Sequence, residues 1–135
     1  MTAVADTSPL ILLAKVNRLT LLPELYREVV VPPAVAMELR AKPDATSPDL
    51  DRFLRSARLQ APENLVQVQT LSMDLGKGEA EAIALATEIP DAILIMDDAE
   101  GRRVAQRLGL RVAGLLGVLI SLWSIPRSLL RSGGW

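Results

Sequence analysis

Short apolar or β-branched runs alternate along the chain with longer segments whose apolar positions recur at helical spacing. The short runs predict strands at residues 2–6, 28–31, 65–69, 92–96 and 110–114. The run AILIM (92–96) is apolar throughout, as expected for a central parallel strand. The run LVQVQ (65–69) alternates with period two, which is typical of a strand. Five strands separated by helices predict an α/β fold with a parallel sheet.

Prolines and capping residues set the expected helix boundaries. Ser8 and Pro9 predict the start of the first helix, because serine can cap a helix and proline is tolerated at its first position. Further helices are predicted at about 18–26, 34–41, 79–89 and 101–108. A helix that opens after Pro48 is expected to carry three arginines, Arg52, Arg55 and Arg58.

The last apolar segment runs from Val112 to Pro126 without a charge. It has about 15 residues, fewer than the roughly 18–20 that a membrane-spanning helix needs. We therefore predict a buried helix after the last strand and no membrane span. The length of 135 residues supports one hydrophobic core, so we expect a single domain over residues 1–135.

The composition excludes most kinds of catalytic site. The chain has no cysteine and no histidine, which excludes a thiol nucleophile, a zinc cluster, a disulfide and a histidine base. An enzyme with this composition is expected to work through carboxylates. The lack of cysteine and of a visible secretory signal fits a cytoplasmic protein. The net charge of −1 provides no overall field for nucleic acid or membrane.

Acidic residues fall on four segments that an α/β sheet could bring together at the carboxyl ends of its strands. They are Asp6, Glu38, Glu79, Glu81, Asp97 and Asp98. Each alone is explained as a helix cap, a turn former or a solvated helix residue. Together they suggest a cation site, because clustered carboxylates repel one another and oxygen ligands suit Mg²⁺ or Mn²⁺. Glu79 and Glu81 lie about 200° apart on their helix, and Glu79 shares the apolar face, so we favour Glu79 for the site and Glu81 for support.

Five segments, in order from about Val4 to Leu119, resemble PIN-domain proteins of the branch related to VapC-type toxins. They are VADTSPLILLAKVNRLTLLPELY, VVVPPAVAMEL, GKGEAEAIALA, ILIMDDAEGRRVAQRLGL and RVAGLLGVL. The resemblance implies a three-layer α/β/α domain with a five-stranded parallel sheet in the order 3-2-1-4-5. It also implies a Mg²⁺- or Mn²⁺-dependent endoribonuclease, often the toxin of a toxin–antitoxin pair, that hydrolyses RNA with metal-activated water. The stretch 121–135 departs from the pattern, which continues with a basic helix.

The family's acidic residues carry over one by one. Asp6 matches the first acid, Glu38 the second and Glu79 the third, a position that is commonly Asp in the toxins. The fourth falls on Asp97 or Asp98, which the resemblance does not separate. The resemblance adds supporting residues beside these acids, namely Thr7, Ser8, Glu81 and Glu100.

Arginines follow the acidic end of the fourth predicted strand, and three are candidates for RNA phosphate contacts: Arg102, Arg103 and Arg107. A solvated helix surface explains them equally well. The apolar N-terminal and C-terminal helices predict a homodimer face or a groove for an antitoxin protein. The alternative to a ribonuclease is a catalytically silent PIN-like module that binds or regulates other proteins.

Overall fold

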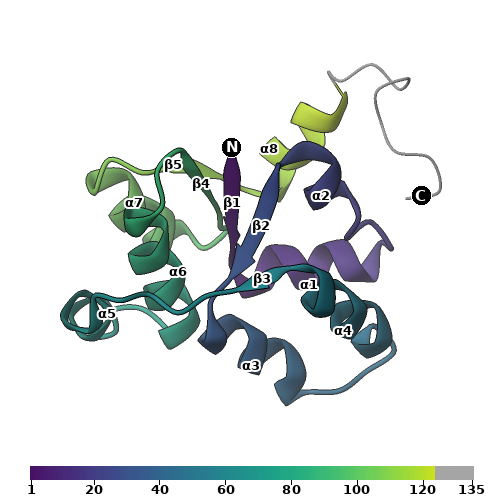
Figure 1. The fold of residues 1–135 in the computed structure, drawn as a ribbon, viewed down its shortest axis with the longest axis horizontal. Helices are drawn as coiled ribbons and strands as arrows, with labels where there is room; N and C mark the ends of the chain where they lie inside the picture. The colour runs from purple at the N-terminus through teal and green to yellow at the C-terminus, as the bar shows by residue number, and fades with distance from the viewer. Residues whose placement is uncertain (124–135) are drawn as a thin grey trace.

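The computed structural model describes residues 1–123 (Figure 1). Within that range five strands form, namely β1 (Thr2–Ala5), β2 (Glu28–Val31), β3 (Arg58–Leu59), β4 (Ala92–Ile95) and β5 (Arg111–Ala113). The helices there are α1 (Thr7–Lys15), α2 (Leu21–Leu25), α3 (Pro33–Ala41), α4 (Ser47–Ser56), α5 (Leu65–Leu71), α6 (Lys77–Glu88), α7 (Ala99–Arg107) and α8 (Leu115–Trp123). The atypical stretch 121–135 falls largely outside the described residues.

The strands form one parallel sheet in the order β3-β2-β1-β4-β5. This confirms the expected α/β fold and its strand order. The central strand β1 pairs with β2 on one side and β4 on the other, so that Ala3 lies between Val29 and Ile93. Short strands of small and β-branched residues suit this position, because both faces of a parallel sheet are covered by helices.

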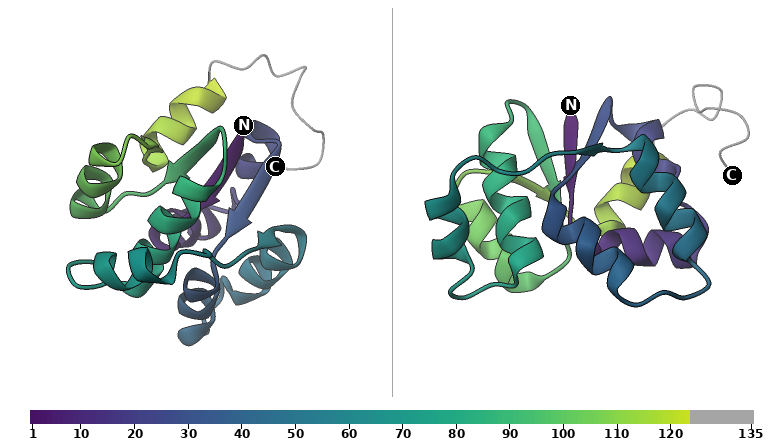
Figure 2. Two further views of the ribbon diagram at one scale, coloured as in Figure 1. Left: turned by 60° about the vertical axis from the view of Figure 1, so that its left-hand side comes forward. Right: turned by 60° about the horizontal axis from the view of Figure 1, so that its bottom comes forward.

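Alternate residues of the inner strands β1, β2 and β4 enter two separate cores. Ala3, Val31 and Ile95 pack on the face of the sheet that meets α1, α2, α4 and α8. Val4 and Leu94 pack on the opposite face, against α6 and α7. Figures 1 and 2 show these two helical layers, with α5 beside α6. The period-two alternation of side chains thus divides fully apolar strands between two cores.

The carboxyl ends of the strands share one edge of the sheet, where α3 lies (Figures 1 and 2). Both β1 and β2 lead into helices within two residues, so the N-termini of α1 and α3 start at this edge. The N-termini of α7 and α8 start there as well, directly after β4 and β5. This edge therefore collects strand-end side chains and several helix N-termini.

The predicted strand at 65–69 is wrong, because these residues form α5. Asn64 caps that helix, and its side-chain oxygen accepts a hydrogen bond from the Gln67 amide at 3.0 Å. Val66 and Val68 then point in different directions, one exposed and one buried. The third strand is instead the pair Arg58–Leu59, which lies beside β2. Arg58 consequently belongs to a strand rather than to the helix of Arg52 and Arg55.

Three other expectations about helices also change. The first helix begins at Thr7 with Asp6 as its N-cap residue, rather than at Pro9 with Ser8 as the cap. The second helix is shorter than the predicted range of about 18–26, because α2 spans Leu21–Leu25. The C-terminal helix α8 is not buried as predicted, because Leu116 and Trp123 are 71% and 88% exposed, and Val118 is the one fully buried residue among those of α8 whose side chains the structure describes. It follows the edge strand β5, so the sheet covers only one of its sides. None of the helices within residues 1–123 is long and apolar enough to cross a membrane.

Candidate metal centre

Asp6 is the most deeply placed acid at the carboxyl edge of the sheet. It follows β1 directly and is only 4% exposed. Burial is the largest cause that raises the pKa of Asp6 from the usual 3.8 to about 6, and a hydrogen bond from the Thr7 amide offsets part of this rise. Nearby negative charges raise the pKa further, and they belong to Glu38, Asp98 and Asp97.

Glu38 reaches this edge from α3 and lies against the first turn of α6. A methyl group added at Gly78 would collide with Glu38 Oε1 and would lie 3.5 Å from Val35 Cγ2. The Glu38 carboxylate therefore occupies space that any side chain at position 78 would need. Gly78 is buried, and it allows α6 and α3 to approach closely enough to hold Glu38 near Asp6.

Glu79 and Asp98 face each other across Gly101. Asp98 caps α7, and its Oδ2 atom accepts a hydrogen bond from the Gly101 amide at 2.7 Å. A methyl group at Gly101 would lie 3.3 Å from both Asp98 Oδ2 and Glu79 Oε2. Burial, followed by the Asp98 carboxylate, raises the pKa of Glu79 to about 7, whereas the Gly101 amide lowers the pKa of Asp98. The two shifts are opposite, so Asp98 ionises before Glu79 as pH rises. Glu79 Oε2 is buried, and no hydrogen-bond partner is found for it within the described residues.

Asp97 has one engaged and one free oxygen. Its Oδ1 atom accepts a hydrogen bond from the Leu115 amide at 2.8 Å, which caps α8. Its Oδ2 atom is buried and has no hydrogen-bond partner. The half-buried guanidinium of Arg102 lies close by, since a methyl group at Gly114 would be 2.7 Å from Asp97 Oδ1 and 2.9 Å from Arg102 Nη1.

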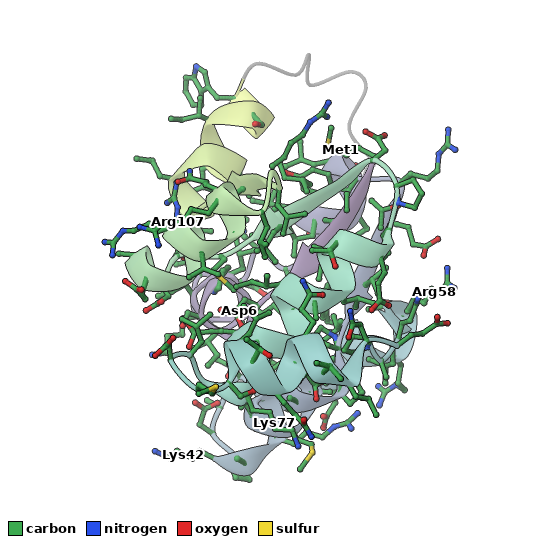
Figure 3. The ribbon with its side chains drawn as sticks, turned by 90° about the vertical axis from the view of Figure 1, so that its left-hand side faces the viewer. Met1, Asp6, Lys42, Arg58, Lys77 and Arg107 are labelled. Atoms are coloured by element: carbon green, nitrogen blue, oxygen red, sulfur yellow. The ribbon has the colours of Figure 1, made fainter. Side chains whose placement is uncertain are left out.

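We call Asp6, Glu38, Glu79, Asp97 and Asp98 the carboxylate cluster. Figure 3 shows Asp6 between Arg107 on one side and Lys42 and Lys77 on the other. Helix N-termini make this concentration of negative charge tolerable, because their amides carry partial positive charge. Amides of α1, α7 and α8 bond to Asp6, Asp98 and Asp97, and Glu79 accepts from Gly76 at the start of α6.

The donor set of the carboxylate cluster fits a hard divalent cation, because every donor is an oxygen. Three buried polar atoms without partners lie at this edge, namely Thr7 Oγ1, Glu79 Oε2 and Asp97 Oδ2. As the side chains stand, no three acidic groups within residues 1–123 are arranged to hold one ion. Glu38 and Asp98 are exposed at this edge, whereas Asp6 is buried.

The remaining predicted site residues lie elsewhere. Glu81 Oε1 accepts a hydrogen bond from the Ala34 amide at 2.9 Å, so Glu81 caps the helix that carries Glu38. Glu100 forms an exposed ion pair with Arg103. Ser8 and Arg107 are exposed to solvent. Glu81 is thus placed to position a member of the carboxylate cluster, whereas Glu100 and Arg103 neutralise each other on the surface.

Sequence reasoning missed the glycines that shape this site. Gly78 and Gly101 both lie in the first turn of a helix. In the sequence, Gly78 falls just before the predicted helix 79–89 and Gly101 is the first residue of the predicted helix 101–108, so neither broke a helical pattern and local sequence provided no signal of a close approach. A pocket beside Glu38 was missed as well, since its walls come from segments that only the fold brings together.

The metal-free protein is expected to lose stability as pH rises from about 4 to 7. At pH below 3.8 Asp6 is protonated in both the folded and the unfolded state. Between pH 3.8 and 6 the unfolded chain releases this proton while the folded chain retains it. The free energy of unfolding therefore falls, by up to about 3 kcal/mol, and Glu79 acts in the same direction up to about pH 7. Asp98 acts oppositely, but only below pH 3.8.

Urea unfolding in EDTA from pH 4 to 8 measures this dependence. If the free energy of unfolding stays level or rises between pH 4 and 7, the pKa of Asp6 is not raised by its burial in the folded protein. Saturating Mn²⁺ at pH 7 is expected to restore stability, because a ligand that binds only the folded state stabilises it.

Comparison with known protein families gives one finding about the whole chain. The family described as DUF3368: PIN domain matches residues 2–124. This range includes all five strands and every member of the carboxylate cluster. No curated protein matches the chain significantly.

Proposed function

The chain belongs to the PIN domain family, and from this premise we propose that it is a metal-dependent endoribonuclease that hydrolyses RNA phosphodiester bonds. One observation carries the proposal above all others. Asp6 is buried among other carboxylates with a pKa raised to about 6, an arrangement that costs stability unless a cation compensates it. Helix capping alone does not explain why the fold keeps a buried carboxylate that lowers its stability.

The carboxylate cluster would hold one or two Mg²⁺ or Mn²⁺ ions through Asp6, Glu38 and Asp97. We assign the fourth family position to Asp97 rather than Asp98, because Asp97 Oδ2 is buried and unpartnered while Asp98 Oδ2 is bonded to an amide. Bound there, a divalent cation supplies Lewis acidity that activates water and stabilises negative charge on the phosphate. Glu79, whose pKa is raised to about 7, would hold Asp98 in place through a hydrogen bond between the two carboxyl groups.

Arg102 and Thr7 supply the neighbouring contacts with the substrate. The ion pairs observed within residues 1–123 do not include Arg102, so its half-buried guanidinium is available to a phosphate oxygen. The Thr7 hydroxyl is buried beside Asp6 without a partner and would orient water or a phosphate oxygen. Arg103 and Arg107 would contribute only distant attraction of RNA from the surface.

We also propose that the protein is the toxin of a toxin–antitoxin pair and forms a homodimer. Support comes from the apolar outer side of α8, where Leu116, Ile120 and Trp123 are exposed at helical spacing. An apolar stripe of this kind favours a protein partner over solvent.

The decisive experiment measures RNA cleavage with Mn²⁺, with Mg²⁺ and with EDTA, and compares Asp97→Asn with Asp98→Asn. Asparagine retains an oxygen that can cap a helix in both variants, so both should fold. We expect cleavage only with the metal, and a loss of about 10²-fold or more for Asp97→Asn but a smaller loss for Asp98→Asn. Because capping explains part of the cluster, the competing hypothesis is a silent PIN module. It predicts neither Mn²⁺ binding by calorimetry nor cleavage.

A further inference from the structure

A pocket of about 420 Å³ opens beside the carboxylate cluster, between α1, α3 and α4. Its volume lies within the roughly 300–1,000 Å³ of small-molecule sites. Apolar side chains of Ile11, Leu39, Ala41 and Leu50 form one part of its wall. The polar part comprises Thr7, Lys15, Glu38, Lys42, Asp44 and Thr46.

Two residues join this pocket to the carboxylate cluster. Glu38 lines the pocket and also lies near Asp6, and Thr7 lines it directly after Asp6 in the chain. Thr7 is only 9% exposed, and its hydroxyl oxygen has no hydrogen-bond partner. The Thr7 hydroxyl is therefore a polar group at the pocket wall that a bound molecule can engage. A molecule bound at the cluster would therefore continue into the pocket.

The charges of the pocket are arranged around its rim. Lys15 and Lys42 are exposed there, at the ends of α1 and α3. Asp44 is close enough to Lys15 to have its pKa lowered by it, after hydrogen bonds from Thr46. The lining thus holds two lysines and two carboxylates, of which Glu38 belongs to the carboxylate cluster and Asp44 is engaged with its own loop and with Lys15. That leaves Lys42 as the cation of the wall for a phosphate. An apolar wall beside a lysine suits a nucleotide, which has one flat apolar part and one anionic part.

We propose that this pocket binds one nucleotide of the RNA strand, next to the phosphate that is cleaved. The base lies on the wall of Ile11, Leu39, Ala41 and Leu50, and the phosphate of that nucleotide meets Lys42 at the rim. This inference rests on the proposed ribonuclease function and extends it, because it makes the pocket the place where the enzyme selects a base.

The first test fills the pocket without touching the carboxylate cluster. Ala41 is exposed at the end of α3, so Ala41→Trp should fold and occupy the space of the base. We expect KM for a short single-stranded RNA to rise about tenfold with kcat little changed, because binding and not the chemical step is affected. The matched control is Ala61→Trp, at an exposed alanine outside the pocket wall. If Ala41→Trp cleaves RNA with an unchanged KM, the proposal is wrong. The pocket would then bind something other than the RNA strand, such as a protein.

The second test is independent of cleavage. Each of the four ribonucleoside 5′-monophosphates is titrated into the metal-free protein and followed by amide NMR. We expect shifts at Ile11, Ala41 and Lys42 that Ala41→Trp removes and Ala61→Trp retains. No shift in that region, or shifts that Ala41→Trp leaves intact, overturns the proposal. Binding without any metal-dependent cleavage by the wild type would instead show that the ribonuclease assignment has failed.

Lys42→Ala reports on the phosphate contact. Loss of one phosphate contact should reduce the salt dependence of single-stranded RNA binding, with a change in log–log slope of about 0.7. The control is Arg55→Ala, at an exposed cation of α4 outside the pocket wall. Equal slopes for Lys42→Ala and the wild type contradict a phosphate at this rim.

Discussion

Replacing Asp6 with asparagine is expected to abolish metal-dependent RNA cleavage and, at the same time, to raise the stability of the metal-free protein. The loss of activity follows because Asp6 is the buried centre of the carboxylate cluster and would bind the cation directly. Removing a ligand of this kind should lower kcat/KM by at least about 10³-fold.

The gain in stability has a separate physical reason. At pH 7 the folded protein holds Asp6 ionised against a pKa of about 6, while the unfolded chain has the usual value of 3.8. Asparagine has nearly the same shape and no charge, so it removes a cost of about 1–3 kcal/mol. Opposite changes in activity and stability are typical of residues kept for function.

Urea unfolding in EDTA at pH 7 and cleavage of a labelled RNA with Mn²⁺ measure the two effects. Asp74→Asn, at an exposed acid outside the carboxylate cluster, is the matched control and should change neither. Wild-type cleavage by Asp6→Asn would remove the basis of the proposed function. A less stable Asp6→Asn protein would show that the charge of Asp6 is compensated without a metal.

Replacing Gly78 with alanine is expected to lower the proposed ribonuclease activity without unfolding the protein. The new methyl group would collide with Glu38 Oε1, the end of a flexible and exposed side chain. The carboxylate should therefore move, while α6 gains up to about 1 kcal/mol in helix propensity. Displacing a catalytic group by about 1 Å can reduce activity about 10²-fold.

A double variant separates displacement from general damage. Glu38→Asp shortens the side chain, so in combination with Gly78→Ala it should recover part of the lost kcat. Gly117→Ala is the control, because a methyl group there meets only ordinary contact with Ala113 at 3.7 Å. Full activity of Gly78→Ala would mean that the position of Glu38 does not matter for catalysis.

The carboxylate cluster shows how a small α/β fold gathers negative charge. Four helices begin at or near the same edge of the sheet, and their amides bond to four of the five acids. Those bonds compensate one oxygen of each acid and leave Asp97 Oδ2 and Glu79 Oε2 without partners. In Asp97, the oxygen that caps α8 and the buried oxygen that the proposed cation would bind are therefore different atoms.

Four of the five acids of the carboxylate cluster were visible in the sequence because they end strands or open helices, and such positions follow from local patterns; Glu38 lies in the second half of α3 and was matched to the second acid through the family resemblance. The run at 92–96 could be read as a buried strand because every residue in it is apolar. The period-two alternation at 65–69 led to the wrong prediction of a strand. These residues form α5, and because Val68 is its one buried residue, the helix has no clear apolar stripe in the sequence. The two-residue strand β3 was invisible, since its pairing with β2 and not its composition makes it a strand.

The sequence by itself determined the fold class, the positions of four of the five strands and the restriction of the chemistry to carboxylates. Those depend on residue types and on contacts between neighbours in the chain. Only the tertiary structure decided that Glu79 faces Asp98, that Glu81 caps α3, and that Asp97 rather than Asp98 has a free buried oxygen. It also decided that Gly78 makes room for Glu38 and that a pocket adjoins the site. These features join segments distant in sequence, and their energies arise from distances and burial that exist only once both cores have packed.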